Sequence, residues 1–184
     1  MKNLINFVAF QAVWFAAVVG ASYGLWWLGP IAATVFAIAH LVSPMRIRGD
    51  GLLIVVALLL GVVIDSAYAF SGALTYAAPF PSAQLAPLWI LALWVGFALT
   101  LNHSLAYLAH RPVVATIAGA VVGPISYWSA GRAFDAVTLG DPLWRTVLAL
   151  SVGWAFAMLV LSLVARRSLR TSTTPETQST EKNS

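Results

Sequence analysis

Long apolar runs separated by short polar breaks follow one another along the chain up to about residue 165. Most of these runs approach the roughly 20 residues that a membrane-spanning helix needs, so the pattern predicts an all-α transmembrane bundle of about six spans. The expected helices cover residues 4–26, 30–43, 52–70, 88–109, 112–130 and 146–165. The second run is too short for a straight span, so its helix either begins earlier, near Tyr23, or is short and sheltered by its neighbours.

Two segments differ from these apolar runs. Residues 71–87 carry no formal charge and contain Pro79, Pro81 and Pro87, which predicts a loop on the membrane surface that proline stiffens. Residues 167–184 are rich in serine and threonine and lack an apolar period, which predicts a disordered cytoplasmic tail. The chain is therefore expected to divide into a six-helix transmembrane domain, residues 1–166, and this tail.

The composition agrees with a membrane protein. Of the 184 residues, 60% are hydrophobic and 9% are charged, whereas soluble domains usually carry about 25% charged residues. Cysteine is absent, so disulfide and thiolate chemistry are excluded. The net charge of +4 comes from basic residues at the ends of the expected helices, which is typical of membrane topology rather than of nucleic-acid binding. We therefore expect no nucleic-acid partner.

The basic residues also predict which helix ends face the cytoplasm. With six spans, one side of the membrane carries Lys2, Arg46, Arg48, Arg111, Arg166, Arg167 and Arg170. The loops on the other side carry either no charge or, between residues 132 and 145, two charges of each sign. Cytoplasmic loops are enriched in lysine and arginine, so both termini are expected in the cytoplasm. A five-span topology would split the basic clusters across the membrane.

Polar side chains inside the expected spans form two layers at different depths. Polar groups are costly in a bilayer and usually face protein or a water-filled cavity. We interpret the inner layer as a candidate ligand-binding site made of Asn6, Gln11, Asn102, His103 and Tyr107. We interpret the outer layer as a candidate ligand-binding site or ion pair made of Asp65, Tyr68, Ser126, Tyr127 and Arg132.

His103 lies at the centre of the inner layer. Helical spacing places it on one stripe with Gly96, Thr100, Tyr107 and His110, and we expect this stripe to face the bundle interior. The stripe favours a polar pocket or a proton-bearing site at His103. The alternative is that His103 only forms hydrogen bonds between helices, as polar groups in membrane interiors do.

The motifs predict neither a cofactor nor a metal. His103 and His110 are two helical turns apart, roughly 10 Å, which is too far for them to share one ion. The sequence contains no phosphate-binding loop, nucleophile elbow, zinc-protease motif or dinucleotide fingerprint. No catalytic residue can be named from the sequence.

Asp65 is the central residue of the outer layer, because an ionisable residue in a span is a functional candidate that needs a partner. Arg132, at a similar depth on the fifth expected helix, is the predicted partner, since each charge would reduce the desolvation cost of the other. Two interpretations stay open. The pair either locks two helices together, or Asp65 takes up protons as part of a coupled process.

Small residues recur at helical spacing on the fifth expected helix, at Ala115, Gly119, Gly123, Ser126 and Ala130. Such a ridge favours close contact with another helix. Pro124 within the ridge predicts a kink or a freed backbone carbonyl near the middle of the membrane.

Three stretches carry a family resemblance: NFVAFQAVWFAAVVGA, LWVGFALTLNHSLAYL and GAVVGPISYWSAGRAF. Over residues 3–165 the chain resembles a domain-of-unknown-function family of small six-pass bacterial inner-membrane proteins. The resemblance implies a multi-pass protein of the bacterial inner membrane without an established activity. It also implies a setting in lipid chemistry, because such genes often lie near genes for fatty-acyl modification of membrane lipids.

Three functional hypotheses follow. The first is an accessory or lipid-binding protein that supports membrane-lipid modification, with membrane lipids and a membrane protein as candidate partners. The second is a small-solute transporter, or the substrate-binding subunit of one, that depends on Asp65 and Arg132. The third is a membrane-embedded enzyme that uses His103 as an acid or base. No motif identifies the chain as an enzyme.

Overall fold

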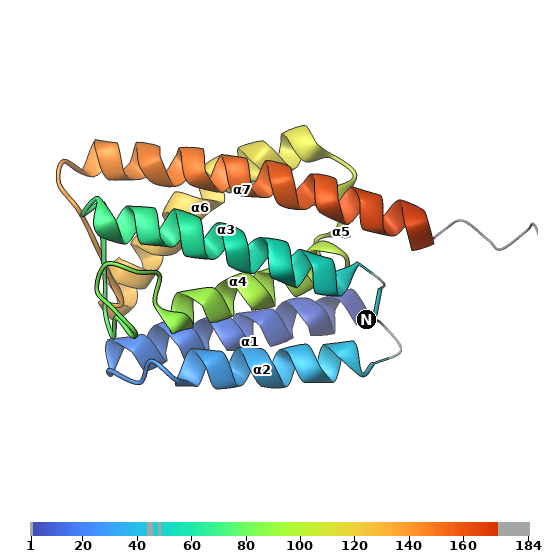
Figure 1. Ribbon diagram of the computed structural model, residues 1–184, viewed down its shortest axis with the longest axis horizontal. Helices are drawn as coiled ribbons and strands as arrows, with labels where there is room; N and C mark the ends of the chain where they lie inside the picture. The colour runs from blue at the N-terminus through green and yellow to red at the C-terminus, as the bar shows by residue number, and fades with distance from the viewer. Residues whose placement is uncertain (1, 44–45, 48, 173–184) are drawn as a thin grey trace, which may run out of the picture.

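The computed structural model shows apolar helices that run alongside one another (Figure 1). It describes residues 2–43, 46–47 and 49–172. The helices are α1 (Lys2–Ser22), α2 (Leu28–Leu41), α3 (Asp50–Phe70), α4 (Leu88–Leu101), α5 (Ala106–Ala109), α6 (Pro112–Phe134) and α7 (Leu143–Ser172). Two short strands are β1 (Leu74–Tyr76) and β2 (Val137–Leu139). The expectation of an all-α fold is therefore confirmed apart from this small two-stranded sheet.

The six longer helices alternate in direction, so α1 begins and α7 ends at the same end of the bundle (Figure 1). Helix α4 packs against α1, α2 and α3, while α7 packs against α3 and α6. The core lies where these helices meet, and its fully buried side chains include Ala17, Leu53, Leu99, Leu150 and Leu161. The polar residues discussed below lie around this core.

Four helices, α1, α3, α6 and α7, are long and apolar enough to cross a membrane. Large apolar side chains on their outer faces are exposed, for example Val63 at 68% and Val152 at 61%, as expected for surfaces that contact lipid. Helices α2 and α4 are also apolar but have 14 residues each. At 1.5 Å per residue they extend about 21 Å, which is less than the roughly 30 Å of a bilayer core. The chain is a membrane protein, and four helices within the described residues have full spanning length.

The second expected helix is short in the structure as well. Helix α1 ends at Ser22, earlier than predicted, and Gly24 follows with a φ of 78°, a conformation that glycine adopts at little cost. Helix α2 then begins at Leu28, so it does not extend back to Tyr23. It packs against α1 and α4, which agrees with the alternative of a short helix sheltered by its neighbours.

The loop predicted between the third and fourth helices contains β1, which the sequence pattern did not indicate. Strand β1 pairs antiparallel with β2, and Tyr76 is aligned with Val137. Both residues are buried, as is Leu74. The sheet lies at the end of the bundle opposite to the start of α1 (Figure 1) and brings Tyr76 against the helices.

The fourth expected helix, residues 88–109, is interrupted in the structure. Helix α4 ends at Leu101, and the short helix α5 begins at Ala106. Between them, the backbone N–H groups of His103 and Leu105 both donate to the carbonyl of Thr100, at 3.0 and 2.8 Å. The predicted stripe from Gly96 to His110 is therefore not continuous, because the residues after Leu101 leave the helical path.

The last helix is longer than predicted. Helix α7 begins at Leu143 and continues to Ser172, so residues 167–172 belong to the helix rather than to a tail. The remainder of the predicted tail, residues 173–184, lies outside the described residues.

Candidate functional site

Two clusters of buried polar side chains lie at opposite ends of α3. Asp50 begins the helix and Asp65 lies near its other end, about 22 Å away along the axis at 1.5 Å per residue. Both aspartates have an exposed fraction of 0%. A buried charge is costly unless it is paired or hydrogen-bonded, so the partners of each aspartate determine what the cluster can do.

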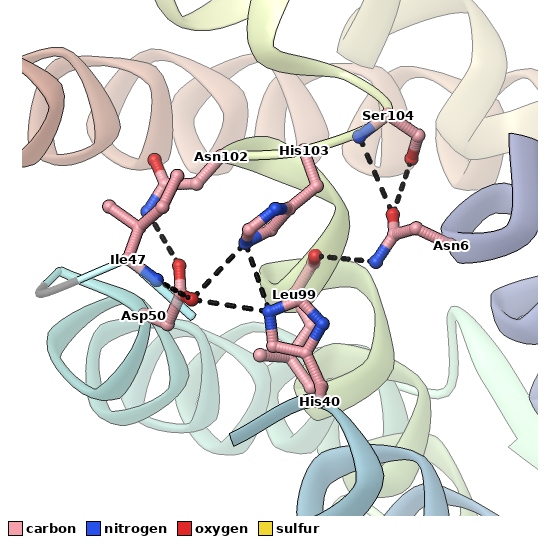
Figure 2. Close-up of polar contacts among 8 residues, drawn as sticks. All are labelled: Asn6, His40, Ile47, Asp50, Leu99, Asn102, His103 and Ser104. Carbon is pink, nitrogen blue, oxygen red and sulfur yellow. Dashed lines mark hydrogen bonds and ion pairs between the residues drawn. The ribbon is translucent and has the colours of Figure 1, made fainter. Parts of the chain in front are cut away.

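Asp50 contacts two histidines (Figure 2). Its Oδ2 lies 3.2 Å from Nε2 of His40 and 3.1 Å from Nε2 of His103. The two Nε2 atoms are themselves 2.9 Å apart. Three ligand-type atoms from α2, from the start of α3 and from the turn after α4 therefore meet at one point, and these three residues form a group that could hold a metal ion.

Two further donors fix the Asp50 carboxylate. Asn102 donates from Nδ2 to Oδ1 at 2.8 Å, and the backbone N–H of Ile47 donates to Oδ2 at 2.9 Å. Both oxygens therefore accept a hydrogen bond in addition to the contacts with histidine. The carboxylate is held in one orientation, with Oδ2 directed at the two imidazoles (Figure 2).

The turn after α4 presents Asn102 and His103 to this cluster, and Asn6 of α1 stabilises the turn. Asn6 donates from Nδ2 to the carbonyl of Leu99 at 3.1 Å. Its Oδ1 accepts a hydrogen bond from the Ser104 hydroxyl at 2.7 Å. The interruption of α4 frees backbone groups that would be unsatisfied in an apolar environment, and Asn6 is the partner of two backbone groups there, the Leu99 carbonyl and the Ser104 N–H.

The structure brings together only part of the predicted inner layer. Asn102 and His103 meet at Asp50, and buried Asn6 of α1 hydrogen-bonds to residues on either side of them. Tyr107 is 57% exposed and accepts a hydrogen bond from Arg111 at 2.6 Å. The interruption of the helix turns it away from the cluster. Gln11 lies elsewhere, in the wall of the cavity described below.

Sequence reasoning missed His40 and Asp50. His40 falls near the end of an expected helix and Asp50 in a short loop, where polar residues need no special explanation. The one available signal was their spacing, because a histidine and an aspartate ten residues apart flank a short turn between two antiparallel helices.

Asp65 is surrounded by donors from three other elements. Tyr76 of β1 donates to Oδ1 at 2.7 Å, and Trp94 of α4 donates from its indole to Oδ2 at 2.7 Å. Tyr127 of α6 also donates to Oδ1. Burial, together with the nearby carboxylate of Asp65, raises the pKa of Tyr76 well above its usual range, so this phenol remains protonated and donates its hydrogen bond.

The expected ion pair between Asp65 and Arg132 is not formed. Arg132 lies near the end of α6, and its side chain is exposed, whereas Asp65 is enclosed by its neutral donors. Tyr68 lies beside this cluster and donates to the carbonyl of Ala149 at 3.1 Å. Ser126 donates to the carbonyl of Val122 within its own helix at 2.9 Å. Of the predicted outer layer, only Tyr127 hydrogen-bonds to Asp65 within the described residues.

Glycines let two indoles stack between the helices near Asp65. The rings of Trp94 and Trp154 are stacked, with centroids 4.8 Å apart and an interplanar angle of 10°. A Cβ on Gly61 would come within 2.4 Å of Trp94, and a Cβ on Gly123 within 2.3 Å of Trp154. Two of the predicted small residues, Gly119 and Gly123, do face α7 closely, which confirms the ridge as a packing surface.

A cavity of about 530 Å³ lies between α1, α4, α6 and α7. Its walls are mostly aromatic and aliphatic and include Phe10, Trp14, Phe97, Leu108, Val122, Trp154 and Met158. The few polar residues that line it include Gln11, Ser126, Tyr127 and Ser129. One residue of the predicted inner layer and two of the outer layer therefore border the same cavity.

Comparisons with known proteins place the chain in a family. Neither the curated proteins nor the solved structures gave a match. A family model described as protein of unknown function, DUF2878, matches residues 3–160. Because this match covers most of the chain and agrees with the resemblance carried by its motifs, the chain belongs to the DUF2878 family.

Proposed function

We propose that this protein binds a lipid and that one acyl chain of the lipid occupies the cavity between α1, α4, α6 and α7. The observation that supports this proposal is the cavity itself, with a volume of about 530 Å³ and a mostly aromatic and aliphatic lining. Ligand sites are usually concave and apolar, with a few polar groups that orient the ligand, and they fall in this range of volume.

The rim of the cavity supports an occupant that enters from the bilayer. Phe7, Phe15 and Val122 line the cavity and are nevertheless 43%, 50% and 56% exposed. They belong to α1 and α6, two helices of spanning length. Side chains on such outer faces contact lipid, so an acyl chain can pass sideways between α1 and α6 without crossing water.

Polar residues in the same cavity suit the polar end of a lipid. The Gln11 amide can donate and accept hydrogen bonds, and the hydroxyl oxygens of Ser126 and Ser129 can accept them. The two serines already donate to backbone carbonyls of α6. We expect the Gln11 amide N–H groups to donate to ester or phosphate oxygens and the serine hydroxyl oxygens to accept from hydroxyl or ammonium groups of a headgroup, while the aromatic walls contact the chain.

The proposed setting is a bacterial inner membrane crossed six times, with both termini in the cytoplasm. In support, α2 and α4 run beside the four long helices (Figure 1), although each is shorter than a full span. Arg46 and Arg111 lie between helices at the end where α1 begins, whereas at the other end the charges of Arg132 and Arg145 are balanced by Asp135 and Asp141. Within this setting we propose an accessory role in membrane-lipid modification, beside a partner enzyme.

Native mass spectrometry after gentle extraction tests lipid binding. Ala118 lines the cavity, so Ala118→Phe should narrow it and reduce the retained lipid about tenfold, because the larger side chain occupies space that the acyl chain needs and overpacking costs about 1–3 kcal/mol. Ile117→Phe is the matched control, since Ile117 is 61% exposed and does not line the cavity. Equal retention in both variants, or no lipid on the unmodified protein, would refute the proposal.

A further inference from the structure

We propose that His40, Asp50 and His103 form a binding site for one divalent first-row transition-metal ion. None of the three residues lines the lipid cavity, so this site goes beyond the proposed lipid binding and is independent of it. The three donors come from separate elements and converge (Figure 2), at the end of the bundle where α1 begins (Figure 1).

The spacing of the three donor atoms fits a metal centre. The two Nε2 atoms and Oδ2 of Asp50 form a nearly equilateral triangle with sides of 2.9, 3.1 and 3.2 Å. An ion about 2.1 Å from each ligand atom separates neighbouring ligands by about 3.0 Å in an octahedron and about 3.4 Å in a tetrahedron. The triangle therefore matches one face of an octahedron, and shifts of a few tenths of an ångström would adapt it to a tetrahedron.

Hydrogen bonds alone cannot satisfy the three contacts. An imidazole Nε2 carries either a hydrogen or a lone pair, and the facing carboxylate oxygen carries lone pairs only. If both Nε2 atoms are protonated, both can donate to Asp50, but their own 2.9 Å contact is then no hydrogen bond. If only one is protonated, a lone pair of the other histidine faces the carboxylate. A cation placed above the plane of the triangle would accept a lone pair from each of the three atoms at once.

The negative charge of Asp50 and the hydrogen bonds that orient its carboxylate also favour a cation. The Asp50 side chain is fully buried, and the hydrogen bonds from Asn102 and Ile47 come from neutral groups. A divalent ion would compensate the buried negative charge. Groups that hydrogen-bond to a metal-binding carboxylate orient it and increase metal affinity. Asn102 and the backbone of Ile47 hydrogen-bond to the Asp50 carboxylate in this way.

The ligand set points to a class of metal. Two imidazoles and one carboxylate suit zinc, iron, manganese or cobalt better than calcium or magnesium, which prefer oxygen ligands alone. Three protein ligands also leave coordination positions open for water or another small ligand. The His103 side chain is 10% exposed, so the site is within reach of solvent at this end of the bundle.

Cobalt(II) binding to the full chain, purified without a polyhistidine tag, tests the site. We expect one cobalt ion per chain, detected by elemental analysis and by its visible absorption. His40→Gln and His103→Gln should each weaken binding at least about 100-fold, because loss of a ligand costs more than the roughly 10–100-fold for a supporting residue. His110→Gln is the matched control, since His110 is exposed and outside the cluster, and it should bind cobalt like the unmodified chain.

Several results would overturn the metal site. These are no cobalt binding by the unmodified chain, undiminished binding by both variants, or an equal loss in His110→Gln. If the variants fail to fold, X-ray absorption of the cobalt-loaded unmodified chain decides: two imidazole ligands support the site, and oxygen ligands alone refute it. Lipid retention by folded His103→Gln should be unchanged, which separates failure of this site from failure of lipid binding.

Discussion

The two buried aspartates of α3 have donors of different kinds. Asp50 faces imidazole nitrogens, which are good metal ligands, whereas Asp65 faces two phenols and an indole N–H. Phenol and indole groups satisfy a carboxylate as neutral donors and leave no convergent lone pairs. We therefore assign Asp65 a structural role: it connects α3 with β1, α4 and α6.

Asp65→Asn should destabilise the protein. The amide that replaces the carboxylate presents an N–H group to one of the three donors, and a buried donor without an acceptor costs about 1–3 kcal/mol. The measurement is thermal or denaturant unfolding in detergent. Asp135→Asn is the control, because Asp135 is exposed with a φ of 54°, a conformation that asparagine tolerates. Equal stability of the two variants would contradict the structural role of Asp65.

Single polar residues within apolar runs were the easiest part of the site to predict. His103, Asn102, Asp65 and Tyr127 stand out because polar groups are rare in spans, and all four belong to the buried clusters. The partner Arg132 was predicted wrongly because depth along a helix does not fix the direction of a side chain. The partners of Asp65 instead include Tyr76 and Trp94, whose apolar rings look ordinary in such a sequence.

Close contact between helices depends on glycines at particular positions, because glycine has no side chain. Gly61 on α3 leaves space for Trp94 of α4, which donates to Asp65 and stacks on Trp154 of α7. On α6, Gly123 leaves space for Trp154. The stacked indoles therefore connect four helices, and their position depends on two glycines.

Gly61→Ala should force α3 and α4 apart. The added Cβ would lie 2.4 Å from the Trp94 ring, and overpacking of this kind costs about 1–3 kcal/mol. Gly51→Ala on the same helix is the matched control, because nothing lies within 4 Å of its Cβ. We expect the control to be neutral or slightly more stable, since alanine favours helix over glycine. The measurement is unfolding in detergent. If Gly61→Ala is as stable as Gly51→Ala or more stable, the result contradicts this packing.

The interruption of α4 was not predictable from the pattern. Apolar residues continue through Leu105 and Leu108, so periodicity extends the helix. The decisive contact is made by Asn6, which is distant in sequence and hydrogen-bonds to Leu99 and Ser104. Strands β1 and β2 were not predicted either, because a strand of three residues leaves almost no periodic signal in the sequence.

At the scale of the whole molecule, the alternating helices place the cluster of His40, Asp50 and His103 at the end where α1 begins and the sheet at the other end (Figure 1). The number of apolar helices and much of their extent could be predicted, because apolar runs are long and their breaks are polar. The cavity could not, since its walls combine mostly apolar residues from helices that are distant in sequence.

Cysteine labelling tests the proposed topology, because the chain has no native cysteine and each introduced thiol is unique. Gln84 and His110 are exposed and lie in turns on opposite ends of the bundle. In intact cells, a membrane-impermeant maleimide should label Gln84→Cys and should label His110→Cys only after permeabilisation. The reverse labelling pattern would place the termini outside the cytoplasm, and labelling of both in intact cells would contradict six spans.

The most direct measurement for the central proposal is an experimental structure of the protein in a lipidic phase. Lipid binding predicts continuous density for an apolar chain between α1 and α6, beside Phe10 and Val122, with its polar end near Gln11 or Ser129. A cavity that is closed by direct packing of α1 on α6, or that is filled with ordered water, would contradict lipid binding.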